Sequence, residues 1–159
     1  MGNSIYVSVK GERQGLISGG CSTFASIGNR YQTGHEDQIL AYAFEHAISR
    51  EQNVNHGPIS FVKPIDKSSP LWGVAISSNE CLDVRFDFYR TSASGSQELY
   101  YSVRLTKAYI SRINTIYPHA IDHENNQPEE MITLKYQSIT WEHHIAGTSG
   151  YSIWDERIM

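Results

Sequence analysis

Hydrophobic and polar residues alternate along most of this chain, and a period of two is the pattern of β-strands. The alternation is cleanest where Leu82, Val84 and Phe86 are each followed by a charged residue. About eight strands are therefore expected. The extended segments fall at residues 5–9, 16–17, 35–50, 59–65, 82–89, 99–113, 132–136, 139–145 and 151–154.

Residues 35–50 are interpreted as one long strand, although Ala and Glu would also permit a helix. Its bulky face is expected to enter the core and its small or polar face to meet something else. The bulky set is Leu40, Tyr42, Phe44 and His46. The opposite set is Ile39, Ala41, Ala43 and Glu45.

One segment changes period and predicts a short helix at about 69–78. Ser69 followed by Pro70 is a helix-start signal. Leu71, Val74 and Ala75 then form an apolar stripe, and the polar run 77–79 ends it. A lone short helix cannot bury its stripe without a partner, so we expect it to lie on a sheet.

The hydrophobic phase shifts after Lys107 and again near Ser138, which indicates a corner or a bulge in two strands. Residues 18–34 are rich in Gly, Ser, Asn and Thr and are expected to form a loop. With no repeat or linker visible, residues 1–159 are predicted to form one mainly β domain, a barrel or a sandwich.

Composition excludes several classes of function. A net charge of −4 with scattered basic residues argues against a nucleic-acid partner. No apolar run approaches a bilayer span and no signal peptide is recognised, so we expect neither membrane insertion nor signal-directed export. Cys21 and Cys81 are expected to be small buried hydrophobes.

Candidate chemistry is sparse. His119 and His123 have the spacing of metal ligands only if they lie on a helix, and the strand pair His143 and His144 would point to opposite faces. The acidic pair 129–130 is interpreted as a solvated strand end, and Trp154 is the best candidate for an exposed aromatic contact. We expect no metal or cofactor and no catalytic residue. A metal-dependent barrel enzyme using His119, His123 or His143 and a carbohydrate-binding β-sandwich remain as alternatives.

Several segments resemble the haemolysin-coregulated protein (Hcp) family of type VI secretion systems. They include the strand-to-helix run 58–71, the later strand 134–141 and residues 141–154, the last resembling the enterobacterial branch. The resemblance implies a β-barrel of two sheets with one flanking helix. It also implies a head-to-tail homo-hexameric ring, and rings that stack into the inner tube of a contractile machine.

The resemblance further implies export without a cleaved signal. The protein would be cytoplasmic and then secreted, with sheath and spike proteins as partners and effector proteins in the lumen. The segment 51–57 resembles the loop that reaches the next ring; its residues are Glu51, Gln52, Asn53, Val54, Asn55, His56 and Gly57. The face that resembles the lumen side is Ile39, Ala41, Ala43 and Glu45. Residues 19–34 look like an insertion, and no toxin domain is expected after Met159.

Overall fold

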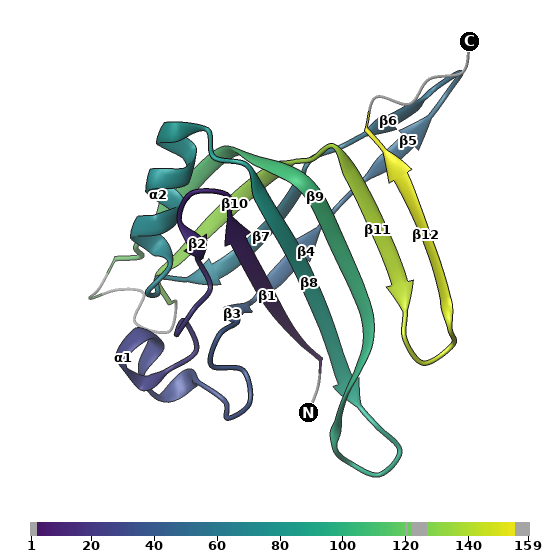
Figure 1. The fold of residues 1–159 in the computed structure, drawn as a ribbon. Helices are drawn as coiled ribbons and strands as arrows, with labels where there is room; N and C mark the ends of the chain where they lie inside the picture. The colour runs from purple at the N-terminus through teal and green to yellow at the C-terminus, as the bar shows by residue number, and fades with distance from the viewer. Residues whose placement is uncertain (1–2, 120, 122–126, 155–159) are drawn as a thin grey trace.

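The computed structural model describes residues 3–119, 121 and 127–154, which form a mainly β domain with short helices (Figure 1). One antiparallel layer is built on β1 (Ser4–Gly11) and β8 (Leu82–Thr91), which pair along the whole length of β1. Beyond β8 this layer continues through β9 (Gln97–Ile116), β11 (Ser138–His143) and β12 (Thr148–Ile153). The short strands β2 (Gly15–Leu16) and β3 (Ile39–Ala41) pair with the free side of β1.

The second layer contains the other half of β9. Beyond residue 108, β9 pairs with β10 (Glu129–Lys135), which in turn pairs with β7 (Ile59–Pro64) and then β4 (Ala43–Glu45). The core between the layers is made of the inward residues of both, including Val84, Phe86, Leu105, Phe61 and Ile132. The predicted alternation is confirmed from Leu82 to Phe86 of β8, where every second residue is buried.

The predicted corner after Lys107 is confirmed. Lys107 has a positive φ of 50°. The register of β9 against β8 also shifts there, from Val84 opposite Leu105 to Leu82 opposite Ala108. An extra residue on one strand bends it, and the bend carries β9 from one layer to the other. The phase change near Ser138 also marks a passage between the layers. The chain leaves β10 at Lys135 and enters β11, in the other layer, at Ser138.

The expected closed barrel is wrong. The hydrogen-bonded path of strands runs from β2 to β4 and does not return to its start. The gap falls at Tyr42, where β3 pairs with β1 and β4 pairs with β7. β3 and β4 each have only three residues. The covalent chain between them, rather than a ladder of hydrogen bonds, therefore joins the two layers there.

The long strand expected over 35–50 is also wrong. The segment contains β3, β4 and a third short strand, β5 (Ile48–Arg50), which belongs to a separate two-stranded sheet. Tyr42 donates its N–H to the carbonyl of Val62 at 2.7 Å and its side chain is 41% exposed. This residue reverses the phase, so that Ile39 and Ala41 point inward before it and Phe44 packs against the core after it.

The predicted helix is present with the predicted bounds, as α2 (Ser69–Ser78), and Asn79 ends it in the left-handed conformation. Its buried face is Trp72 and Ala75, whereas Val74 is 51% exposed. The predicted stripe was therefore partly wrong, because it omitted the large Trp72 ring. The helix covers one end of the two layers (Figure 1).

The segment predicted as a loop over residues 18–34 contains one turn of helix, α1 (Phe24–Ile27), and the 3₁₀ turn η1 (Gly28–Arg30). Cys21 in this segment is buried as expected, and burial raises the pKa of its thiol to about 11, whereas Cys81 is half-buried. Within the described residues, no helix is both long and apolar enough to cross a membrane.

Candidate functional site

The segment 51–57, predicted as a loop, is largely the second half of a β-hairpin. β5 pairs with β6 (Val54–His56), with Ile48 opposite His56 and Arg50 opposite Val54. Figure 1 shows this hairpin reaching away from the two layers, on the side opposite α1 and α2. Its turn is tightened by Arg50, whose guanidinium donates to the carbonyl of Gln52 at 3.2 Å. The predicted loop is therefore corrected to a hairpin. The β-branched residues Ile48 and Val54 favour strands and lie on its two arms.

The seven residues of this segment divide into a tip and a base. Residues 51–55 form the turn and one arm, and Glu51, Gln52 and Asn55 are exposed. His56 is only 9% exposed, and the Gly57 N–H donates to the carbonyl of Ala47 at 2.9 Å. A Cβ at position 57 would lie 2.6 Å from that carbonyl oxygen, so this close approach requires glycine.

The four residues predicted to share one open face do not share it. Ile39 and Ala41 are 0% and 5% exposed and belong to the core, so that part of the prediction is wrong. Ala43 and Glu45, beyond the reversal at Tyr42, are exposed on β4. Only two of the four predicted residues are therefore exposed.

A buried charge cluster lies beneath the start of α2. Lys63 is fully buried, and its ammonium donates to Glu130 at 2.6 Å, to Asp66 at 3.1 Å and to the hydroxyl of Ser69 at 3.2 Å. Ser69 in turn donates to Glu130 at 2.5 Å. These hydrogen bonds connect β7, β10 and the first turn of α2 through the Lys63 ammonium.

The cluster corrects the interpretation of residues 129–130 as a solvated strand end, because Glu130 is 5% exposed. Its position opposite Lys63 in the β7–β10 ladder brings the two together. The sequence offered one signal that was not used: Lys63 occupies an inward position of the alternating run 59–65, where an uncompensated charge is too costly to bury.

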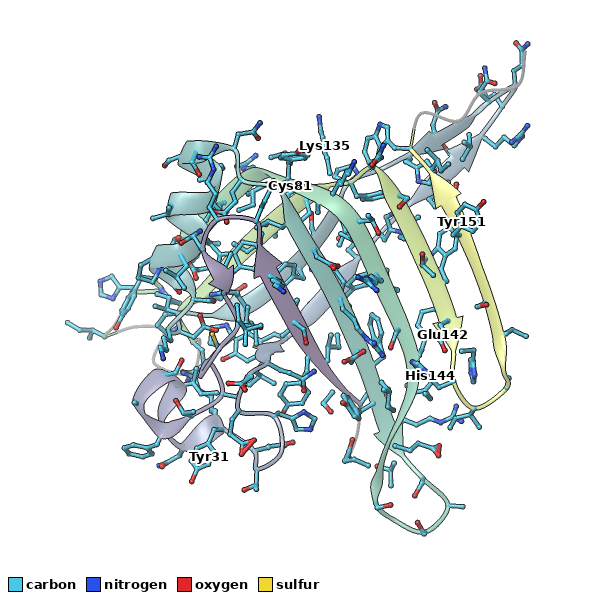
Figure 2. All side chains as sticks on the ribbon, in the orientation of Figure 1. Tyr31, Cys81, Lys135, Glu142, His144 and Tyr151 are labelled. Carbon is cyan, nitrogen blue, oxygen red and sulfur yellow. The ribbon has the colours of Figure 1, made fainter. Side chains whose placement is uncertain are left out.

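Sequence reasoning also missed a chain of polar residues across β8, β9 and β11. Ser102 lies 2.8 Å from Nε2 of His144, whose Nδ1 lies 3.3 Å from Glu142. Figure 2 shows Glu142 and His144 near the end of β11. The order serine, histidine, carboxylate is that of a hydrolase triad.

The hydrogen-bond directions around Ser102 argue against its acting as a nucleophile. Ser102 is 4% exposed and donates its own proton to Asp87 at 2.7 Å, so Nε2 of His144 must donate to the serine instead of accepting from it. Arg85 donates to the same oxygen at 3.3 Å. The hydroxyl is thus occupied on all sides, and the group acts as a cross-link between strands.

The other candidate residues do not assemble a site. Among the described residues no group of three or more His, Cys, Asp or Glu could hold a metal ion. His123 lies outside the described residues, and His119 and His143 each accept a backbone N–H from a nearby residue. Trp154, expected to be exposed, instead stacks on His56 with ring centroids 5.7 Å apart.

The sequence pattern of one protein family, described as "Type VI secretion system effector, Hcp", matches residues 6–143. This chain belongs to the Hcp family. A major exported protein of Pseudomonas aeruginosa PAO1 is 37% identical to it over 166 residues, covering 97% of this chain and 96% of the relative. The uncharacterized protein YhhZ of Escherichia coli K12 is 43% identical over 150 residues, which are 93% of this chain but 37% of that relative's length.

Solved Hcp structures agree with this membership. One Hcp crystal structure has a TM-score of 0.91 and 36% identity, and the secreted protein Hcp3 of P. aeruginosa has a TM-score of 0.88 and 39% identity. Both comparisons cover 97% of this chain and 99% of the other. As an Hcp protein, the chain is a type VI secretion protein with a structural role and not an enzyme.

Proposed function

We propose that this Hcp chain forms hexameric rings that stack into the inner tube of a type VI secretion apparatus and are expelled through it. The proposal rests most on the similarity to the secreted protein Hcp3, which extends over 99% of that chain. The partners would be further copies of the chain, the sheath and spike proteins, and effector proteins carried in the lumen. The protein would be made in the cytoplasm and leave through the apparatus.

A closed ring with one kind of subunit uses a head-to-tail contact, so each subunit must present two different, complementary patches. The free edge of β12 suits one of them. Within the described part of the sheet, β12 pairs with β11 alone, and residues 148–151 on it are exposed. Such an edge is a ready template for another chain, and burying it in a ring would remove that liability.

The β5–β6 hairpin suits the contact between stacked rings. It reaches beyond the body of the subunit, and its exposed tip carries the polar residues Glu51, Gln52 and Asn55. Amide and backbone hydrogen bonds support a reversible interface better than a large apolar surface would, because polar, wet interfaces are typical of transient contacts. Reversible stacking matches a tube that is assembled, expelled and dispersed.

The passenger face would consist of Ala43 and Glu45 on β4, since both are exposed. A small apolar side chain beside a single carboxylate offers little adhesive area to a passing protein. It would therefore permit sliding and weak, charge-dependent binding.

The size of the purified protein tests the ring. We expect size-exclusion chromatography to show a species of about six times the subunit mass of 18.0 kDa, and negative-stain images to show rings. A monomer at all accessible concentrations, with no ring in the images, would contradict the proposal.

Reversing the charge of the passenger face tests the lumen assignment. We expect Glu45→Lys to change the amount of co-purified passenger by roughly tenfold, the effect of about 1.4 kcal/mol of binding free energy. The rings themselves should be unaffected, because the side chain is exposed and not part of the core. Glu12→Lys, an equal charge change at an exposed turn position, serves as the control and should leave loading unchanged. Loss of rings in Glu45→Lys would show that the residue faces a neighbouring subunit.

A further inference from the structure

Two histidines at the base of the β5–β6 hairpin share one tyrosine hydroxyl. Tyr136, between β10 and β11, is 4% exposed, and its Oη lies 2.8 Å from Nε2 of His46 and 2.8 Å from Nδ1 of His56. His46 precedes β5 and His56 ends β6. Both ends of the hairpin are therefore attached to the body of the protein through one oxygen atom.

His56 also contacts β12 and the residue that follows it. Nε2 of His56 lies 2.9 Å from the hydroxyl of Ser152, and the ring stacks on Trp154 with an interplanar angle of 21°. The Tyr136 ring meets Trp154 edge to face, with centroids 4.9 Å apart. His56 is thus enclosed by aromatic rings and hydroxyls, which bind the neutral imidazole well and solvate a cation poorly, and His46 is half-buried beside the Tyr136 ring.

Counting protons shows which charge states this arrangement accepts. The hydroxyl carries one proton, so with both rings neutral one imidazole donates to Oη and the other accepts from it, and every contact is satisfied. With both rings protonated, both must donate to Oη, and its own proton has to turn to the carbonyl of Gly57, 3.4 Å away. Two positive charges would then flank one oxygen in a partly buried site.

We propose that His46, Tyr136 and His56 form an acid-sensitive latch, which holds the β5–β6 hairpin to the body while the rings are neutral and releases it when both take up protons. The latch concerns the attachment of the hairpin to its own chain. It therefore goes beyond the proposed stacking role and does not depend on whether rings stack.

The groups that surround the latch support its release by acid. His46 and His56 come from the two sides of the hairpin, Tyr136 comes from the β10–β11 connection, and β12 and the residue after it contribute a serine hydroxyl, a backbone carbonyl and an indole. Burial lowers the pKa of His46, and the charge of His56 lowers it further, against a hydrogen bond to the Gly57 carbonyl. Burial also lowers the pKa of His56, against the carbonyl of Ile153. Among the described residues no carboxylate contributes to either shift, and burial raises the pKa of Tyr136, so that it stays protonated.

The sign of the pH dependence follows from these shifts. An opened hairpin exposes both rings to water, where their pKa returns to the ordinary value of 6.5. Below that pH the open form binds more protons than the closed form, so acid favours opening. The loss of attachment begins as the pH falls through 6.5 and stops growing below the lowered pKa values of the closed form.

Amide hydrogen exchange of a peptide covering residues 48–56 measures this opening directly. After correction for the intrinsic exchange rate, we expect protection to fall by about tenfold or more between pH 7.5 and pH 5.0, the change that linkage to one or more protons allows over this range. The β8–β9 turn, residues 91–97, serves as an internal reference and should not change. Equal protection of the hairpin at the two pH values would overturn the proposal.

Three variants separate the latch from general acid sensitivity. We expect the double variant His46→Gln with His56→Gln to lose the pH dependence, and His144→Gln, at the histidine bonded to Ser102, to keep that of the wild type. Tyr136→Phe keeps both histidines but removes their bridge, so the hairpin should already be less protected at pH 7.5. A double variant as pH-dependent as the wild type would refute the latch. If that variant does not fold, ring titration of the wild type by NMR decides, because ordinary pKa values for both histidines would also refute it.

Discussion

Replacing Lys63 by alanine is expected to lower the free energy of unfolding by about 3–5 kcal/mol, the usual cost of breaking a buried ion pair from one side. The ammonium is fully buried between the carboxylates of Asp66 and Glu130, whose side chains are 1% and 7% exposed. Its removal would leave two buried negative charges facing each other without a cation. Urea denaturation at a fixed protein concentration measures the loss, because oligomer formation makes stability depend on concentration.

The matched control is an ion pair of similar geometry on the surface. Arg104 donates to Asp83 at 2.6 Å, but the two side chains are 58% and 47% exposed. Water and salt screen such a pair, so Arg104→Ala should cost less than about 1 kcal/mol. If Lys63→Ala costs no more than Arg104→Ala, the cluster does not hold α2 to the sheet as described. The variant Lys63→Met tests the packing component, because it keeps the volume and should still destabilise strongly.

Exchanging residues 52–55 for Gly and Ser is expected to spare single rings and to reduce stacking and export by at least about tenfold. The tip of the hairpin lies outside the core, so the change removes little folding free energy. It does remove the amide groups of Gln52 and Asn55 and loosens a turn that is held by Arg50 and paired through Val54. A flexible tip must then lose conformational entropy on docking, which weakens the contact further.

Three measurements separate these outcomes: ring formation by size exclusion, tube formation by electron microscopy, and the amount of protein in the culture medium. The control is a Gly/Ser exchange of Thr91 and Gln97, an exposed pair that flanks the β8–β9 turn, and it should leave all three unchanged. Normal tubes from the hairpin variant would remove the stacking assignment while leaving the ring proposal intact. Loss of the rings themselves would place the hairpin in the contact between subunits of one ring.

Elements whose burial pattern is set by neighbours in the sequence were predictable. In β8 the predicted apolar side Leu82, Val84 and Phe86 is buried, whereas Asp83 and Arg85 between them are half-buried. The bounds of α2 follow from a proline at its start and Asn79 at its end, both of which act within a few residues. The bend of β9 was visible as a change of phase, because a bulge shifts every later side chain to the other face.

The division of residues 35–50 into separate strands could not be predicted from local sequence. Local alternation is the same whether Ile39 and Phe44 point to opposite faces of one strand or face one core from two strands in different layers. Only the pairing of β3 with β1 and of β4 with β7 decides the matter, and both partners are distant in the sequence. The reversal at Tyr42 therefore left no local trace, and half of the predicted passenger face became core.

Local sequence patterns are enough to predict the strand-rich class, the helix at 69–78, the corner in β9 and the membership of a secretion family, because each of these depends on residues close together in the chain. Which side chains share a proton or a charge depends instead on the folded arrangement of distant segments. Lys63 meets Glu130 and His46 meets Tyr136 across long stretches of chain, and a carboxylate that reads as solvated becomes buried when a lysine faces it. Such partnerships depend on strand order and register, which hydrophobic periodicity does not encode.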